Sequence, residues 1–176
     1  MLLIGMGANL PAPDGRCPLT TCQDAAFALA ALPGLKLAAL SNWYETDAMP
    51  PSGQPPYING VARLEGKRDP LALLRDLQTI ERQYGRQRSV PNAARTLDLD
   101  IVAMADFVQL EADPIIPHPR MHQRAFVLMP LLDVAPDWYH PVLHASARSL
   151  LAGLPGQGVR LASRSHLRDE LSGPMP

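Results

Sequence analysis

The stretch Arg95-Thr96-Leu97-Asp98-Leu99-Asp100-Ile101 determines how this chain is interpreted. Apolar and acidic residues alternate along it, which is the pattern of a β-strand with one polar face. Successive side chains of a strand point to opposite faces, so the aspartates share one face and the leucines and isoleucine the other. At a rise of about 3.3 Å per residue, the two aspartates start about 6.6 Å apart.

Two carboxylates at that separation repel each other by about 2.5 kcal/mol at an effective dielectric constant near 20. The flanking Leu99 and Ile101 predict a strand inside the protein, where water does not dissipate this cost. A bound divalent cation would remove it. Mg²⁺ fits best, because it takes oxygen ligands and commonly binds one or two carboxylates together with substrate phosphates. The alternative is an edge strand with two solvated aspartates, although Asp is disfavoured in strands.

Length and composition limit the class of protein. The 176 residues suit one domain with a core, and 47% hydrophobic and 19% charged residues predict a folded chain. A net charge of −1 argues against a nucleic-acid-binding protein. No basic leader or long apolar stretch is present, so we expect a reduced cytoplasmic protein without a membrane partner. No role is readable for Cys17 and Cys22.

The hydrophobic pattern alternates between strand and helix along the first part of the chain. Proline and glycine residues separate the segments. The expected order is β-α-β-β-α-β, the arrangement of ferredoxin-like α/β (α+β) folds. The expected strands are Leu2–Met6, Leu35–Thr46, Tyr57–Glu65 and Arg95–Ala103, and the expected helices run from Thr20 or Thr21 to about Leu32 and from Asp69-Pro70 to Gly85.

A C-terminal helical extension is expected after this core. Its clearest element is a short helix around Ala125–Val134. No internal repeat indicates a second domain. We therefore expect a single domain over residues 1–160, followed by a polar tail over residues 161–176 that frays from the fold.

Arginines gather in the loop that leads into the acidic strand. Arg86, Arg88 and Arg95 bracket this loop, beside the expected Mg²⁺ site. A polyphosphate substrate needs this combination, because the metal bridges its oxygens and guanidinium groups take up its spread charge. Ordinary surface arginines on a solvated loop are the simpler alternative.

A second basic group follows the acidic strand. His118 lies between Pro117 and Pro119, which fix its backbone, and Arg120 and Arg124 come next. A histidine held rigidly beside two arginines fits a phosphate contact. A buried histidine whose hydrogen bonds are satisfied within the protein is an equally open interpretation.

Three aromatic residues, Trp43, Tyr57 and Phe126, form a candidate slot for a flat heterocycle. Core packing is the more common role for each of them. Gly5 and Gly7 follow the first strand, but the third glycine of a dinucleotide fingerprint and the lysine of a P-loop are missing.

Several motifs together resemble the 6-hydroxymethyl-7,8-dihydropterin pyrophosphokinase family of the folate pathway. The resemblance runs from Ile4 to about His140, and its most specific motif is the Arg-Thr-Leu-Asp-Leu-Asp run. The motifs that carry it are Gly7-Ala8-Asn9-Leu10, Tyr44-x-Thr46, Gln54-Pro55-x-Tyr57-Ile58-Asn59, Glu81-x-x-x-Gly85-Arg86, Arg95-Thr96-Leu97-Asp98-Leu99-Asp100, Pro117-His118-Pro119-Arg120-Met121 and Arg124-x-Phe126.

The resemblance implies a Mg²⁺-dependent diphosphokinase with the ferredoxin-like fold. Such an enzyme moves the terminal pyrophosphoryl group of ATP to the hydroxymethyl group of the reduced pterin and releases AMP. Asp98 and Asp100 would bind two Mg²⁺ ions, one of which helps to deprotonate the substrate hydroxyl. The partners would be ATP and the reduced pterin, and we expect a monomer.

The resemblance also implies roles for individual residues. Arg86 and Arg95 would act with the aspartates in catalysis. The ATP side would consist of Gln78, Glu81, Arg88, His118 and Arg124, with the backbone of Ile101 at the adenine. The pterin would lie between Tyr57 and Phe126, with Asn59 and the backbone around Thr46 and Met49 at its hydrogen-bonding edge. The loops Asp47–Pro56 and Arg86–Ala94 would close over both substrates.

The chain departs from the family in the second of these loops. Many members carry Trp-Gly-Pro-Arg where this chain has Asn92-Ala93-Ala94-Arg95, so one lid contact is missing. Two other functions stay open. One is a non-catalytic ATP- or pterin-binding domain of the same fold. The other is a metal-dependent hydrolase or nucleotidyl transferase that uses the same acidic strand.

Overall fold

The computed structural model describes residues 1–47, 53–86 and 93–162. A six-stranded sheet forms its centre, with the strand order β5-β1-β4-β3-β8, and β2 pairs with β4 next to β3. Every pairing in this sheet is antiparallel. The strands are β1 (Leu2–Ala8), β2 (Leu35–Leu40), β3 (Tyr44–Thr46), β4 (Tyr57–Gly66), β5 (Asp98–Met104) and β8 (Arg160–Leu161).

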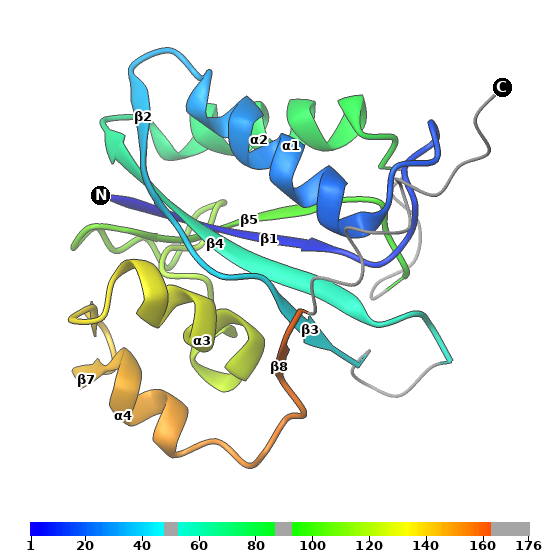
Figure 1. Ribbon diagram of the computed structural model, residues 1–176. Helices are drawn as coiled ribbons and strands as arrows, with labels where there is room; N and C mark the ends of the chain where they lie inside the picture. The colour runs from blue at the N-terminus through cyan, green and yellow to red at the C-terminus, as the bar shows by residue number, and fades with distance from the viewer. Residues whose placement is uncertain (48–52, 87–92, 163–176) are drawn as a thin grey trace, which may run out of the picture.

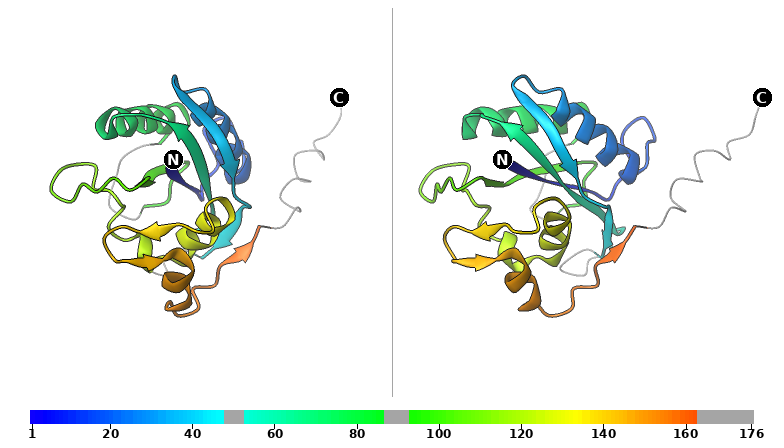
Figure 2. Two further views of the ribbon diagram at one scale, coloured as in Figure 1. Left: turned by 90° about the vertical axis from the view of Figure 1, so that its left-hand side faces the viewer. Right: turned by 60° about the vertical axis from the view of Figure 1, so that its left-hand side comes forward.

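Helices cover both faces of the sheet. Helices α1 and α2 lie on one face, and α3 and α4 lie on the other, as the front and side views show (Figures 1 and 2). The first part of the chain runs β1-α1-β2-β3-β4-α2-β5, and β2 and β3 both pair with β4 as two parts of one interrupted strand. With these two counted as one, the order is the β-α-β-β-α-β of a ferredoxin-like fold, which confirms the expectation. The helices are α1 (Pro18–Ala30), α2 (Pro70–Gln83), α3 (Ala125–Val134) and α4 (Ala147–Ala152), joined by the short elements η1 (Met121–Gln123), β6 (Tyr139–His140) and β7 (Ala145–Ser146).

Two hydrophobic cores result, one on each face of the sheet. Alternation along β1 sends Ile4 and Met6 into the first core, with α1 and α2, and Leu3 into the second core, with α3. Both faces of β1 are therefore buried. This explains why the strand is a nearly continuous apolar run in the sequence.

Helix α2 begins and ends where the sequence predicts. The Asp69 side chain accepts a hydrogen bond from Ala72 N at 2.9 Å, and Pro70 occupies the first turn. Gly85 follows the helix with a φ of +79°. Helix α1 starts earlier than expected, at Pro18, and Cys17 precedes it without a side-chain cap. The expected start at Thr20 or Thr21 is therefore wrong. The helix begins with a proline in its first turn and needs no threonine cap.

The expected strand Leu35–Thr46 is divided into β2 and β3. At the break, Ser41 Oγ accepts a hydrogen bond from Val61 N at 2.9 Å, and Asp133 accepts one from Asn42 N at 3.0 Å. Side chains thus supply part of the pairing here, next to the backbone hydrogen bond from Ser41 N to Val61 O at 3.0 Å. The bulky ring of Trp43 packs where a Cβ on Gly60 would clash with it.

The acidic strand also differs from the expectation. It begins at Asp98 rather than Arg95, and β5 lies at the edge of the sheet. Its apolar residues are nevertheless buried, because both hydrophobic cores include β5 residues. The prediction of a largely buried strand is therefore confirmed for its apolar face, although the strand lies at the edge of the sheet.

Strand β8 spans the expected boundary between residues 160 and 161. Leu161 pairs with Tyr44, so the chain is still part of the sheet at that point. Residues 163–176 lie outside the described part of the chain, and the polar tail stays a prediction there. Among the helices of the described residues, none has the length and apolar character needed to cross a bilayer.

Candidate active site

A cavity of about 560 Å³ opens on the α3 face of the sheet, beside the first turn of α3. Its floor is built by β1, β4 and β5. The side chains on this face change character along the strands, from the buried Leu3, Val61 and Val102 in the second core to smaller and polar residues in the pocket. The sheet therefore continues past its apolar cover and exposes a polar floor.

Glycines keep this floor open. Gly5 lies opposite Asp100 in the β1–β5 pairing, and Gly7 lies opposite Asp98. A Cβ on Gly5 would come within 3.2 Å of a Val102 methyl carbon, and one on Gly7 within 3.4 Å of an Asn59 side-chain oxygen. Any larger residue at either position would project into the space between the aspartates and Asn59.

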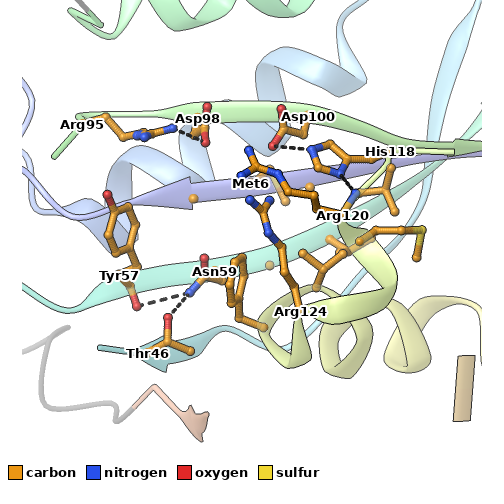
Figure 3. Close-up of a pocket in the computed structure, with 18 of the residues that line it drawn as sticks. Met6, Thr46, Tyr57, Asn59, Arg95, Asp98, Asp100, His118, Arg120 and Arg124 are labelled. Carbon is orange, nitrogen blue, oxygen red and sulfur yellow. Dashed lines mark hydrogen bonds and ion pairs between the residues drawn. The ribbon is translucent and has the colours of Figure 1, made fainter. Parts of the chain in front are cut away.

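Asp98 and Asp100 both line the pocket, as their alternation in the sequence predicts (Figure 3). Asp98 makes ion pairs with Arg86 and Arg95, the second at 2.6 Å. Asp100 has no such partner among the described residues; His118 Nε2 is 4.0 Å from its nearer oxygen. Removal from water, reinforced by the negative charge of Asp98, raises the pKa of Asp100 to about 6.

A second carboxylate, that of Glu81, holds Arg86 in place at Asp98. Arg86 donates to both Asp98 and Glu81, and Glu81 is only 3% exposed. Glu81 also accepts a hydrogen bond from Leu99 N at 2.8 Å, which joins α2 to β5. Burial alone would lower the pKa of Arg95, but the charge and hydrogen bond of Asp98, together with the electrostatic effects of Tyr57 and Asp100, outweigh it and the pKa is raised. Both arginines are therefore charged next to the pocket.

His118 is fixed beside the end of the acidic face. Its backbone N–H donates to Val102 O at 2.9 Å, and its Nδ1 accepts from Arg120 N at 3.1 Å. Burial, followed by the charges of Arg124 and Arg120, lowers the pKa of His118 to about 4. The ring is therefore neutral at pH 7. Because Nδ1 accepts, we assign the ring proton to Nε2, which faces Asp100.

Two further arginines reach into the pocket from the α3 side (Figure 3). Arg124 precedes α3, and burial, together with the charge of Arg120, lowers its pKa. Its guanidinium carbon is 5.5 Å from the centroid of the Phe126 ring. Arg120 is missing from the predicted site residues, and its position two residues after His118 was the available signal.

On the opposite side of the pocket, the rings of Tyr57 and Phe126 and the polar side chains of Asn59 and Thr46 form a slot with a polar edge. Asn59 donates from its amide to Thr46 Oγ1 at 2.9 Å, so its orientation is fixed. The Tyr57 hydroxyl donates to Gln54 at 3.3 Å, and Phe126 lines the same pocket. Trp43 does not line it. The prediction that Trp43 belongs to the slot is wrong, because this ring packs against the first core.

The remaining predicted site residues lie elsewhere. Gln78 and Glu81 border a separate hollow of about 200 Å³, which they share with Arg82 and Arg86. Ile101 is buried in the first core, on the face of β5 that points away from the pocket. Met49 and Arg88 lie outside the described residues.

Asn9 organises the site without lining it, and it is missing from the predicted set. Its amide donates to Pro55 O at 3.1 Å, and its side-chain oxygen accepts from Arg95 N at 2.8 Å. Asn9 is only 1% exposed, so it joins the two loops that border the pocket from inside the protein. The available signal was its place in the motif Gly7-Ala8-Asn9-Leu10.

The donor set at this site fits a hard cation that shares its coordination with a substrate. Over the described residues, His, Cys, Asp and Glu nowhere gather in a group of three or more suited to a metal. Two carboxylates on one strand face, with open space before them, are what Mg²⁺ uses when phosphate oxygens and water complete its shell.

Comparisons with known proteins agree with this geometry. Residues 3–136 match the family described as 7,8-dihydro-6-hydroxymethylpterin-pyrophosphokinase (HPPK). The 2-amino-4-hydroxy-6-hydroxymethyldihydropteridine pyrophosphokinase of Pseudomonas aeruginosa is 38% identical over 89% of this chain and 93% of the relative. The protein of the same name from Synechocystis is 39% identical over 79% of this chain and 68% of the relative.

Longer relatives contain a similar region. The folic acid synthesis protein fol1 of Schizosaccharomyces pombe is 39% identical over 80% of this chain, which spans only 19% of that protein. The wild-type HPPK-DHPS of Plasmodium falciparum, solved with pteroate, has the same fold at a TM-score of 0.64 and 14% identity, over 86% of this chain and 43% of that one. The chain therefore belongs to the 7,8-dihydro-6-hydroxymethylpterin pyrophosphokinase family, whose reaction transfers pyrophosphate from ATP to hydroxymethyldihydropterin in folate synthesis.

Proposed function

We propose that this chain carries out the family reaction with Asp98 and Asp100 as ligands for two Mg²⁺ ions. The observation that carries the proposal is that both carboxylates face one cavity over a glycine floor, within a ring of basic side chains. In the reaction, the hydroxymethyl oxygen of the pterin bonds to the β-phosphorus of ATP. The bond from that phosphorus to the α-phosphate oxygen breaks, AMP leaves, and the hydroxyl proton passes to solvent.

The charge state of the aspartates supports a cation here. The pKa of Asp100 lies above that of an ordinary Asp because of burial and the negative charge of Asp98, and this supports a cation that would compensate its ionised form. Mg²⁺ held by these carboxylates would supply positive charge for the phosphates and make the substrate hydroxyl more acidic. The chain then needs no general base of its own for this proton.

In this proposal, Arg86 and Arg95 pair first with Asp98 and then with the triphosphate. Without ligand, their guanidinium groups neutralise Asp98. When the triphosphate enters, its oxygens offer both arginines a bidentate partner, and Asp98 becomes available as a metal ligand. Glu81 remains bonded to Arg86 from behind and keeps it near the pocket.

Phosphate charge on the other side of the pocket would meet His118, Arg120 and Arg124. His118 is neutral at pH 7 and contributes a hydrogen bond from Nε2 rather than a charge. The arginines supply positive charge that stabilises the transition state as the pyrophosphoryl group moves.

The pterin would lie between Tyr57 and Phe126, with its hydrogen-bonding edge toward Asn59 and Thr46. The fixed Asn59 amide and the open floor over Gly7 support this placement. ATP contacts through Gln78, Glu81, Arg88 and Ile101, and a pterin contact at Met49, stay predictions. So do the cytoplasmic location, the monomeric state and the single domain over residues 1–160.

The test is an assay with ATP, Mg²⁺ and 6-hydroxymethyl-7,8-dihydropterin that separates AMP from ADP. AMP that forms only in the presence of the pterin supports the proposal. ADP would indicate ordinary phosphoryl transfer, and release of phosphate without acceptor would indicate a hydrolase. Absence of any turnover would favour a binding domain. Asp98→Asn and Asp100→Asn are the matched variants, and normal turnover in either one contradicts the assigned roles.

A further inference from the structure

Strand β8 lies beyond the part of the chain that matches the family, which ends at residue 136. It nevertheless borders β3, the strand that brings Thr46 to the pocket (Figure 1). Glu45 pairs with Arg160 in the ladder, and Ala162 N donates to Trp43 O at 2.9 Å. A segment from the C-terminal region therefore completes the sheet next to the substrate pocket.

The side chain of Arg160 strengthens this pairing. Its Nε donates to Glu45 Oε1 at 2.9 Å, and its terminal nitrogen is 3.6 Å from Asp47. Glu45 and Asp47 flank Thr46 in the sequence. Strand alternation directs Glu45 to the face opposite that of Thr46, whereas Asp47, just after the end of β3, lines the pocket together with Thr46. Arg160 thus holds β3 through Glu45, on the face away from the pocket, and through Asp47 at the pocket border, while Arg160 itself does not line the pocket.

Thr46 transmits this constraint to the pocket floor. It is 4% exposed, and its hydroxyl accepts the amide hydrogen bond of Asn59. That bond turns the Asn59 carbonyl oxygen toward Gly7, where it borders the open floor. A shift or twist of the three-residue strand β3 would therefore rotate the Asn59 amide, which is the group expected to meet the pterin edge.

We infer that Arg160 is a positioning residue for the pterin, acting through β3, Thr46 and Asn59. This inference rests on the proposed function. Exposed ion pairs contribute little to stability, so loss of this one should leave the fold intact. Its effect should appear as weaker pterin binding, because a small misplacement of a substrate-orienting group has a large effect on a bound geometry.

The experiment compares Arg160→Ala and Arg160→Lys with the wild-type enzyme in the AMP assay, with KM for each substrate and kcat measured separately. The expected result for Arg160→Ala is an increase of about fivefold in the pterin KM. The KM for ATP, kcat and the melting temperature should stay near the wild-type values. Arg160→Lys keeps the charge and should recover part of the effect, and Glu45→Gln, which removes the partner, should reproduce it.

Arg16→Ala is the matched control. Arg16 is also an exposed arginine paired with two carboxylates, Asp14 and Asp24, and it does not line the pocket. An unchanged pterin KM in Arg160→Ala, or an equal change in Arg16→Ala, overturns the inference. So does a change confined to kcat or to the KM for ATP. A wild-type enzyme that forms no AMP would instead refute the proposed function, and the two failures are thereby distinguished.

Discussion

Asp98 and Asp100 are adjacent on one strand face, yet their surroundings differ. Asp98 is compensated by two arginines, whereas the nearest cation-forming group to Asp100 is a histidine whose pKa is lowered. Ionised Asp98 therefore stabilises the ligand-free fold, whereas ionised Asp100 destabilises it. An uncompensated charge of this kind is expected at a binding site where the ligand supplies the opposite charge.

This difference predicts that two similar substitutions have the same effect on kcat but different effects on the melting temperature. Asp98→Asn and Asp100→Asn should each lower kcat by about a thousandfold, because each removes a charge that acts on the transferring group. Asp98→Asn should also lower the melting temperature, since it removes the carboxylate partner of Arg95 and one of the two carboxylate partners of Arg86. Asp100→Asn should leave the melting temperature equal or raise it. Calorimetry in EDTA checks both, and a drop of equal size in the two variants would contradict this account.

The pH dependence of stability should reveal two opposing groups. The pKa of Asp100 rises from 3.8 to about 6, so between these values the folded state holds the extra proton and stability falls as pH rises. The pKa of His118 falls from 6.5 to about 4, so in that window the unfolded state holds the extra proton and stability rises with pH. In the wild-type protein these slopes largely cancel.

Removing either Asp100 or His118 should reveal the pH dependence of stability that the other group causes. Between pH 4.5 and 6, Asp100→Asn should become more stable as pH rises, and His118→Gln should become less stable, relative to the wild-type profile. Urea midpoints measured across this interval without metal test the signs. Parallel profiles for all three proteins would show that neither pKa is shifted as described.

At the scale of elements, local signals decide what the sequence predicts well. Helix α2 was predictable because Asp69, Pro70 and Gly85 act on adjacent backbone. The break between β2 and β3 was not, because Asp133 satisfies Asn42 from 91 residues away. The direction of Trp43 was missed for a related reason: it depends on which face of β4 has a glycine, at position 60.

The same contrast applies to the site. Alternation along the 95–101 stretch predicted that the aspartates share a face, and the structure confirms it. It did not predict that β5 would be an edge strand, which depends on the strand order. The role of Asn9 was equally hidden, because the hydrogen-bond partners Pro55 and Arg95 are 46 and 86 residues away.

Gly85 provides a prediction for the end of α2. Its φ of +79° disfavours any side chain, and a Cβ there would lie 2.3 Å from Pro13 Cγ. Gly85→Ala should therefore destabilise the protein by about 1–3 kcal/mol, and it should raise the KM for ATP because Arg86 is the next residue. Gly15→Ala is the control, since Gly15 has a φ of +88° with nothing within 4 Å of its Cβ position. Equal destabilisation in both variants would exclude the contact with Pro13 as the added cause.

At the scale of the whole molecule, the pocket depends on both layers of the fold. Three strands make its floor, α3 and its preceding turn make one wall, and the loops joined by Asn9 make the entrance. The first core holds the strands in register from the opposite face. A ligand that fills this pocket therefore contacts segments that are distant in sequence, and its binding should stabilise the entire domain rather than one loop.

The melting temperature should then report metal-dependent binding directly. A non-hydrolysable ATP analogue with Mg²⁺ at about a hundred times its Kd should stabilise the fold by about 2.7 kcal/mol, which corresponds to about 5–10 °C at this size. With EDTA the shift should fall sharply, because the phosphates and the aspartates then repel each other. In Asp98→Asn and Asp100→Asn, the difference between Mg²⁺ and EDTA should shrink, while binding through the arginines leaves a smaller shift under both conditions. A wild-type shift that is equal with and without Mg²⁺ would show that the aspartates do not bind the nucleotide through metal.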